Sequence, residues 1–165
     1  MQTQRFTRLS GMALAVMLTL LIGSVRADDS QLEGTWDVTV TFLECSSQCP
    51  CPPSPSPGEA PTAPGLHMYL KNGSFLDAGG GSLLRGPAPG SWEVIGPHEF
   101  EAHYKFYLFN SDGTRRGSEV VTSHIQLTRP DAFEANATFD FFDPAGHRTS
   151  PEDGCTIKYT ARRFE

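Results

Sequence analysis

The stretch GTWDVTVTF, residues 34–42, alternates apolar and polar side chains with a period of two. Trp36, Val38, Val40 and Phe42 fall on one face, whereas aspartate and threonine side chains fall on the other. Successive side chains of a β-strand point to opposite faces, so this pattern predicts a strand with one buried face.

The same alternation returns along most of the chain, and no stretch shows a persuasive helical period. For example, Phe100, Ala102, Tyr104, Phe106 and Leu108 alternate with mostly charged residues. Eight strands are predicted in this way, over residues 36–42, 66–71, 74–77, 91–95, 99–108, 121–127, 133–141 and 157–163. The chain is therefore predicted to be all-β.

The connections between these strands alternate in length. Asn72-Gly73, Gly96-Pro97 and residues 129–131 have the composition of short turns. The other connections are longer, over residues 44–65, 78–90, 110–117 and 143–154. Alternate connections of an up-and-down meander lie at opposite ends, so the chain is predicted to form an eight-stranded antiparallel barrel with a tight floor and an elaborated rim.

Closure of a barrel requires the first and last strands to pair. Setting Trp36 opposite Arg163 brings apolar residues of the two strands together on one face. The resulting pairs are Val38 with Ala161, Val40 with Tyr159, and Phe42 with Ile157.

Gly34-Thr35-Trp36 at the start of the first strand, with Arg163 late in the last, resembles the lipocalin and wider calycin barrels. The resemblance implies structural roles for Gly34, Trp36 and Arg163, with the guanidinium stacked on the indole. More narrowly, the chain is similar to small secreted bacterial proteins of unassigned activity. Those proteins carry a Cys near the end of the first strand and finish in Gly-Cys and Arg-Phe-Glu, here Cys45, Gly154-Cys155 and residues 163–165.

The first residues predict export. Arg5 and Arg8 precede an apolar run over residues 12–25, and Val25-Arg26-Ala27 has the small residues of a cleavage site. We therefore expect a signal peptide over residues 1–27 and a single barrel domain over residues 28–165, secreted or periplasmic. The apolar run is shorter than a membrane span needs, so no retained membrane span is expected.

The remaining chain is acidic. Loss of the three arginines in the signal peptide leaves a net charge of about −9, which disfavours nucleic acid and anionic membranes as partners. The sequence does not determine an oligomeric state, and it shows no recognisable catalytic motif, metal site or cofactor site. His103 and His124 on outward faces, with Glu99 or Glu101 nearby, have conceivable metal geometry but are interpreted as residues of a solvated face.

All four cysteines follow the predicted cleavage point, so disulfides are expected. Three pairings are possible, and a Cys49–Cys51 bridge would close a tight ring around Pro50. We expect Cys45 to pair with Cys155, across the ends of the first and last strands. The roles of Cys49 and Cys51 stay open.

The inward faces mix large aromatic residues with small ones such as Ala102, Ala135 and Ala161. Small inward residues leave room for an apolar or amphipathic molecule, although alternating sizes can also fill a tapering barrel. If the barrel is hollow, the expected ligand-binding residues are Tyr104, Phe106, Ser123, Phe139, Phe141 and Tyr159. The proline-rich loop at about residues 46–64 either covers the mouth or is a disordered excursion.

The leading hypothesis is an exported protein that holds a small hydrophobic molecule in a β-barrel cup. Two alternatives stay open from the sequence. One is an enzyme related in shape to barrel-fold isomerases or cyclases, and the other is a structural or interaction protein with a solid core.

Overall fold

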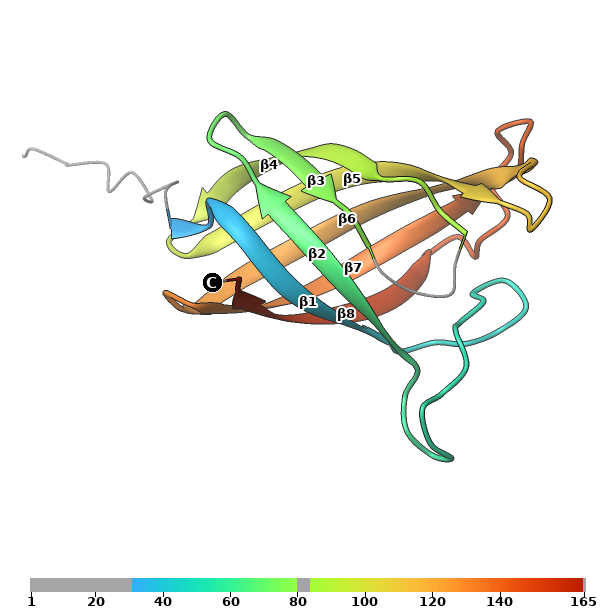
Figure 1. Ribbon diagram of the computed structural model, residues 1–165, viewed down its shortest axis with the longest axis horizontal. Coiled ribbons are helices and arrows are strands. Elements are labelled where there is room, and N and C mark those ends of the chain that lie inside the picture. The colour runs from blue at the N-terminus through green and yellow to red at the C-terminus, as the bar shows by residue number, and fades with distance from the viewer. Residues whose placement is uncertain (1–30, 80–83, 165) are drawn as a thin grey trace, which may run out of the picture.

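The computed structural model describes residues 31–79 and 84–164, which form one closed barrel of eight antiparallel strands (Figure 1). The predicted signal peptide over residues 1–27 lies outside the described residues. In the described part of the chain, no helix has the length and apolar character to cross a membrane.

Each strand pairs with the next along the chain, and the last returns to the first, which confirms the predicted fold class. The strands are β1 (Gly34–Phe42), β2 (Thr62–Tyr69), β3 (Ser74–Asp77), β4 (Ala88–Gly96), β5 (Glu99–Phe109), β6 (Arg115–Arg129), β7 (Ala132–Phe142) and β8 (Cys155–Arg163).

Three strands begin well before the residues at which the alternation predicts them. β2 begins at Thr62 although it contains Pro64, because β3 pairs only with residues 67–69 and the start of β2 pairs with β1 alone. Proline is tolerated in such an edge position, since its missing N–H faces no neighbouring strand. β4 begins at Ala88 and β6 at Arg115, beyond the regions of clear alternation.

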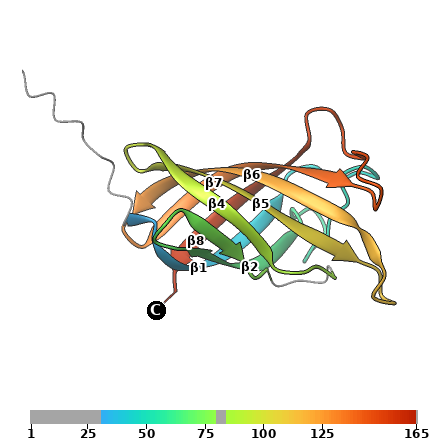
Figure 2. The ribbon, with the colours of Figure 1, turned by 90° about the horizontal axis from the view of Figure 1, so that it is seen from above.

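The long and short connections lie at opposite ends of the barrel, as predicted (Figures 1 and 2). Residues 43–61, 110–114 and 143–154 leave one end, and the short turns over residues 70–73, 97–98 and 130–131 close the other. Gly73 adopts a φ of 75° in the β2–β3 turn, a conformation that glycine reaches without steric cost.

The closing pair, β1 with β8, has the expected register, with Trp36 opposite Arg163 and Phe42 opposite Ile157. The Arg163 guanidinium lies 4.3 Å from the centre of the Trp36 ring. It also donates hydrogen bonds to the carbonyls of Gln31, Glu33 and Pro130, at 2.8, 2.7 and 3.2 Å. One side chain thus joins β1, β8, the chain before β1 and the β6–β7 turn.

The floor of the barrel is packed solid with aromatic side chains. Trp36 is fully buried, contacts Phe133 edge-on at 5.0 Å between ring centres, and donates its indole N–H to the Leu32 carbonyl. Leu32 is itself fully buried. Tyr69 also packs against Phe133, so aromatic side chains fill the interior at the closed end.

The expected Cys45–Cys155 disulfide is not formed. Cys155 pairs with Cys49, and Cys45 pairs with Cys51. The physical reason is the strand alternation: continued in register beyond Phe42, β1 would point residue 45 outward, whereas Cys155 faces inward. The loop after β1 instead turns back and brings Cys49 over the barrel.

Replacing Arg163 with methionine keeps an apolar stem but removes the charge and its donors. We expect Arg163→Met to lower the free energy of unfolding by about 3 kcal/mol, because three backbone carbonyls lose charged donors and the indole loses its cation. Arg162→Met, at the preceding position in β8, should change the free energy of unfolding by less than about 0.5 kcal/mol. Urea unfolding of both variants measures the difference, and equal effects would contradict the role of Arg163.

The two disulfides should differ in their contribution to stability. Their sequence separations are 106 residues for Cys49–Cys155 and 6 residues for Cys45–Cys51. Because a longer closed loop restricts the unfolded chain more, the Cys49→Ala/Cys155→Ala variant should lose about 4–5 kcal/mol and the Cys45→Ala/Cys51→Ala variant about 2 kcal/mol. Chemical denaturation compares the two, and a larger loss from the short bridge would argue against this explanation.

Candidate functional site

A cavity opens in the half of the barrel opposite the packed floor. The space open to the centre of a water-sized sphere is about 60 Å³, and all the space between the lining atoms, open solvent included, is about 700 Å³. The smaller of these volumes is enough for only a few waters, so a larger molecule would have to place most of its bulk toward the open solvent. The lining is mainly apolar, from Val40, Phe42, Pro50, Pro52, Ala63, Pro64, Gly65, Phe106, Val121, Phe141 and Ile157, with His67, Asp77, Arg85, Tyr104, Glu119 and Tyr159 as its polar members.

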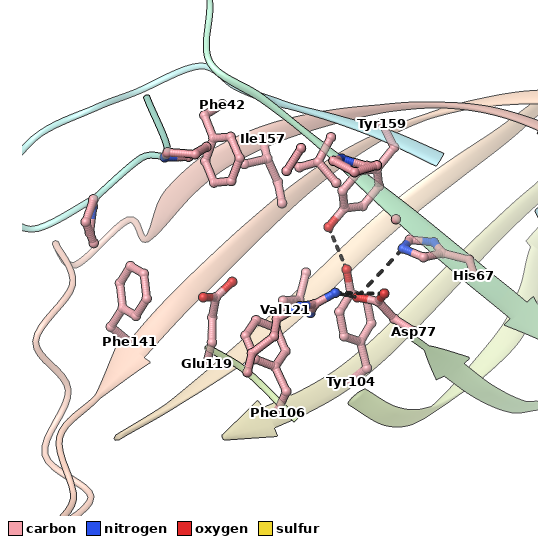
Figure 3. Close-up of a pocket in the computed structure, with 17 residues that line it drawn as sticks. Phe42, His67, Asp77, Tyr104, Phe106, Glu119, Val121, Phe141, Ile157 and Tyr159 are labelled. Carbon is pink, nitrogen blue, oxygen red and sulfur yellow. Dashed lines mark hydrogen bonds and ion pairs between the residues drawn. The ribbon is translucent and has the colours of Figure 1, made fainter. Parts of the chain in front are cut away.

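Tyr104 of β5 and Tyr159 of β8 meet across the cavity (Figure 3). Their hydroxyl oxygens are 2.6 Å apart, and both side chains are buried. Burial raises the pKa of each hydroxyl well above its usual range, so both keep their protons. Since one hydroxyl donates to the other, the pair retains one O–H that can donate to a ligand.

A second polar group joins His67, Asp77 and Arg85 on the wall formed by β2 and β3. Arg85 Nη2 donates to both carboxylate oxygens of Asp77, at 2.8 and 2.7 Å, and its guanidinium lies 4.4 Å from the centre of the Phe106 ring. His67 Nε2 is 3.9 Å from Asp77. Burial lowers the pKa of His67 to about 4, although Asp77 opposes this, so the imidazole is neutral at neutral pH.

Glu119 of β6 is the third polar element, and it stands apart from the other two. Only 7% of the residue is exposed. Its direct neighbours across the sheet are Phe106 of β5 and Phe141 of β7. Figure 3 shows its carboxyl group pointing into the cavity, away from the contacts of Asp77. Within residues 31–79 and 84–164, no hydrogen bond or ion pair reaches it.

Burial raises the pKa of Glu119 from 4.5 to about 8, because the surrounding aromatic rings replace the water that would stabilise its charge. Arg85 opposes this rise, and Asp77 adds to it. The cavity therefore contains two acids in different states. Asp77 is paired with Arg85, whereas Glu119 is mostly protonated at neutral pH.

The proline-rich loop after β1 borders the mouth. Pro50 and Pro52 line the cavity, and both disulfides lie beside them. The Cys49–Cys155 bridge ties this part of the loop to the first residue of β8. Residues 50–52 are thereby held at the mouth as part of its wall.

The structure brings four of the six expected ligand-binding residues to the cavity, namely Tyr104, Phe106, Phe141 and Tyr159. Ser123 lies one inward position deeper on β6 than the cavity-lining Val121, and Phe139 packs between Phe42 and Phe141. Neither Ser123 nor Phe139 lines the cavity. The Ser123 hydroxyl is buried with no hydrogen-bond partner among the described residues.

Three charged residues of the cavity, Asp77, Arg85 and Glu119, are not among the predicted binding residues. The period-two alternation nevertheless places two of them on the inward face. Glu119 continues the inward series of Val121 and Ser123 by one step, and Asp77 follows the inward Phe75 by two residues. Because both residues are charged, they do not appear as members of an apolar alternation. Arg85 follows no strand pattern, because it reaches the cavity from the β3–β4 connection.

The outward histidines of β5 and β6 do lie together. Glu101 accepts from His103 at 2.6 Å and lies 3.1 Å from His124. Across residues 31–79 and 84–164, no group of three or more His, Cys, Asp or Glu is arranged to hold a metal ion.

Comparison with known proteins supports the fold. No protein-family profile matches this chain, and no curated protein matches it. Among solved structures, a de novo designed fluorescence-activating β-barrel is 16% identical, with a TM-score of 0.50. EF1p2_mFAP2b bound to DFHBI is 15% identical, with a TM-score of 0.52. Each comparison covers 84% of this chain and 98% of the other. The chain therefore shares its fold with these closed barrels.

Removing the buried carboxyl should change how stability depends on pH. Because Glu119 binds its proton more tightly in the folded state, its contribution is present below about pH 4.5 and is lost as the pH rises to about 8. We expect Glu119→Gln to raise the free energy of unfolding by about 2–4 kcal/mol at about pH 9 and by little at about pH 5.

Urea unfolding at both pH values measures this gain. Glu93→Gln, an exposed position on β4, removes the same charge and should show no such pH-dependent gain. A gain of equal size at both pH values would contradict the assigned burial of the Glu119 charge.

Proposed function

We propose that this protein is exported and binds a small apolar or amphipathic molecule in the open half of its barrel. The observation that carries the proposal is the asymmetry of the interior. One half is filled with aromatic side chains, and the other contains an open cavity with a mainly apolar wall and a few buried polar groups. Ligand sites in proteins typically have this composition.

The shape of the space favours a ligand that enters only partly. Phe42, Phe106 and Phe141 offer apolar surface in the wider mouth, whereas the Tyr104–Tyr159 pair and Glu119 offer buried polar contacts. A molecule with a compact polar end and a larger apolar body suits both parts.

The solved barrels support the proposal by analogy. EF1p2_mFAP2b has the same fold and is bound to DFHBI. That complex concerns a protein with 15% identity, so it supports the capacity of the fold and not a particular ligand.

Export is part of the proposal because two features favour it. The sequence of residues 1–27 has the pattern of a cleaved signal peptide. All four cysteines of the chain are joined in disulfides, which persist in oxidising compartments outside the cytoplasm.

Titration with the uncharged fluorescent probe N-phenylnaphthylamine tests the binding function. We expect saturable binding of one probe per chain, with a dissociation constant of about 1–10 μM, because the probe can bury its rings against the apolar mouth. Val121→Phe and Ala63→Phe fill the cavity from β6 and β2, and each should weaken binding at least about tenfold.

Thr122→Phe places the same ring on the outer side of β6 and serves as the matched control, which should bind the probe as the unmodified protein does. Circular dichroism verifies that each variant folds. Absence of saturable binding, or equal binding by the cavity and control variants, would overturn the proposal.

A further inference from the structure

The Glu119 carboxyl group is the one feature of the cavity that the barrel itself does not use, as far as the described residues show. It is buried, it points into the cavity, and its two neighbours across the sheet are the aromatic residues Phe106 and Phe141. A buried acid without a partner costs stability, so a partner supplied by a ligand would recover part of that cost.

The other charges of the cavity cannot serve as this partner. Arg85 places its guanidinium on both oxygens of Asp77 and against the ring of Phe106. His67 is neutral, and Tyr104 and Tyr159 are uncharged hydroxyl groups that share one hydrogen bond. Glu119 therefore faces a mainly apolar space. A positively charged ligand group would be attracted to its carboxylate there, and a negatively charged one would be repelled.

We infer that the molecule bound by this barrel carries a protonated amine, and that Glu119 binds this amine at the mouth of the cavity. The inference rests on the proposed binding function and specifies its ligand class as a small amphipathic amine. The apolar body would lie among Phe42, Phe141 and Ile157, and the ammonium group would donate to the Glu119 carboxylate.

The aromatic surroundings and the overall charge favour the same ligand. Phe141 stands beside Glu119, and an ammonium group is attracted to the face of an aromatic ring. The other neighbour of Glu119 across the sheet is Phe106, whose ring is already in contact with the Arg85 guanidinium. The ring of Phe141 is therefore the one available to a ligand. The net charge, −6 for the full sequence and about −9 without residues 1–27, further attracts cations to the protein.

Binding of this kind has a defined proton balance. The empty site holds a protonated Glu119 at neutral pH, since burial raises its pKa to about 8. When an amine binds with its own proton, Glu119 becomes a carboxylate and its proton passes to the solvent. One proton is released for each amine bound, no covalent bond changes, and amine affinity should increase between about pH 6 and pH 8.

The test uses isothermal titration calorimetry of the full mature chain with naphthylmethylamine, naphthylmethanol and naphthoate, which share one apolar body. At about pH 8 we expect the amine to bind about tenfold more tightly than the alcohol, and naphthoate to bind most weakly. In Glu119→Gln, amine and alcohol should bind within about twofold of each other.

Two further readouts separate recognition by Glu119 from a general effect of charge. Titration at pH 7 in two buffers of different ionisation enthalpy should show release of close to one proton per amine, and no release in Glu119→Gln. Glu93→Gln, which lowers the net negative charge equally from the outer face, should keep both the amine preference and the proton release.

The outcomes distinguish this inference from the binding function on which it rests. Equal binding of amine and alcohol, a preference for naphthoate, or an amine preference that survives in Glu119→Gln would overturn the inference but leave a ligand-binding barrel. If none of the three compounds binds and N-phenylnaphthylamine also fails to bind, the proposed function and the inference both fall.

Discussion

The antiparallel pairing of β1 with β8 is the constraint on which the rest of the structure depends. Without it the sheet would have two open edges, and no interior would be separated from solvent. Arg163 strengthens this pairing at the floor, where its guanidinium covers Trp36 and binds three backbone carbonyls from two other segments. At the other end, the Cys49–Cys155 bridge joins the start of β8 to the loop that follows β1. The seam is thus secured at both ends.

Closure at the floor and openness at the mouth follow from where the large side chains lie. The inward residues of β1 change from Trp36 at the floor to Val40 halfway, and those of β2 change from Tyr69 to Gly65. Because a barrel of eight strands is just wide enough for side chains to fill, the small inward residues partway along β1 and β2 leave space. The cavity is therefore a consequence of residue size along the strands.

The sequence predicts the barrel well because the fold depends on alternation and turn length, which are local properties. It predicts the site less well. Tyr104 and Tyr159 were found since both are large inward residues, but Arg85 comes from a connection whose path depends on packing. The disulfide pairing is also hard to predict from local sequence. Strand register places Cys155 near the end of β1, but the path of the following loop determines that Cys49 is its partner.

Glu119 remains the interior residue that packing does not explain. A leucine at this position would fill similar volume between Phe106 and Phe141 without the cost of burying an acid. Asp77, by comparison, is accounted for by its bonds to Arg85. The difference between the two acids is one of partners. Asp77 has its cation within the chain, whereas Glu119 points into the cavity and has no hydrogen bond or ion pair among the described residues. A buried acid that points into a cavity without a partner is better explained by the proposed recognition of a ligand than by folding.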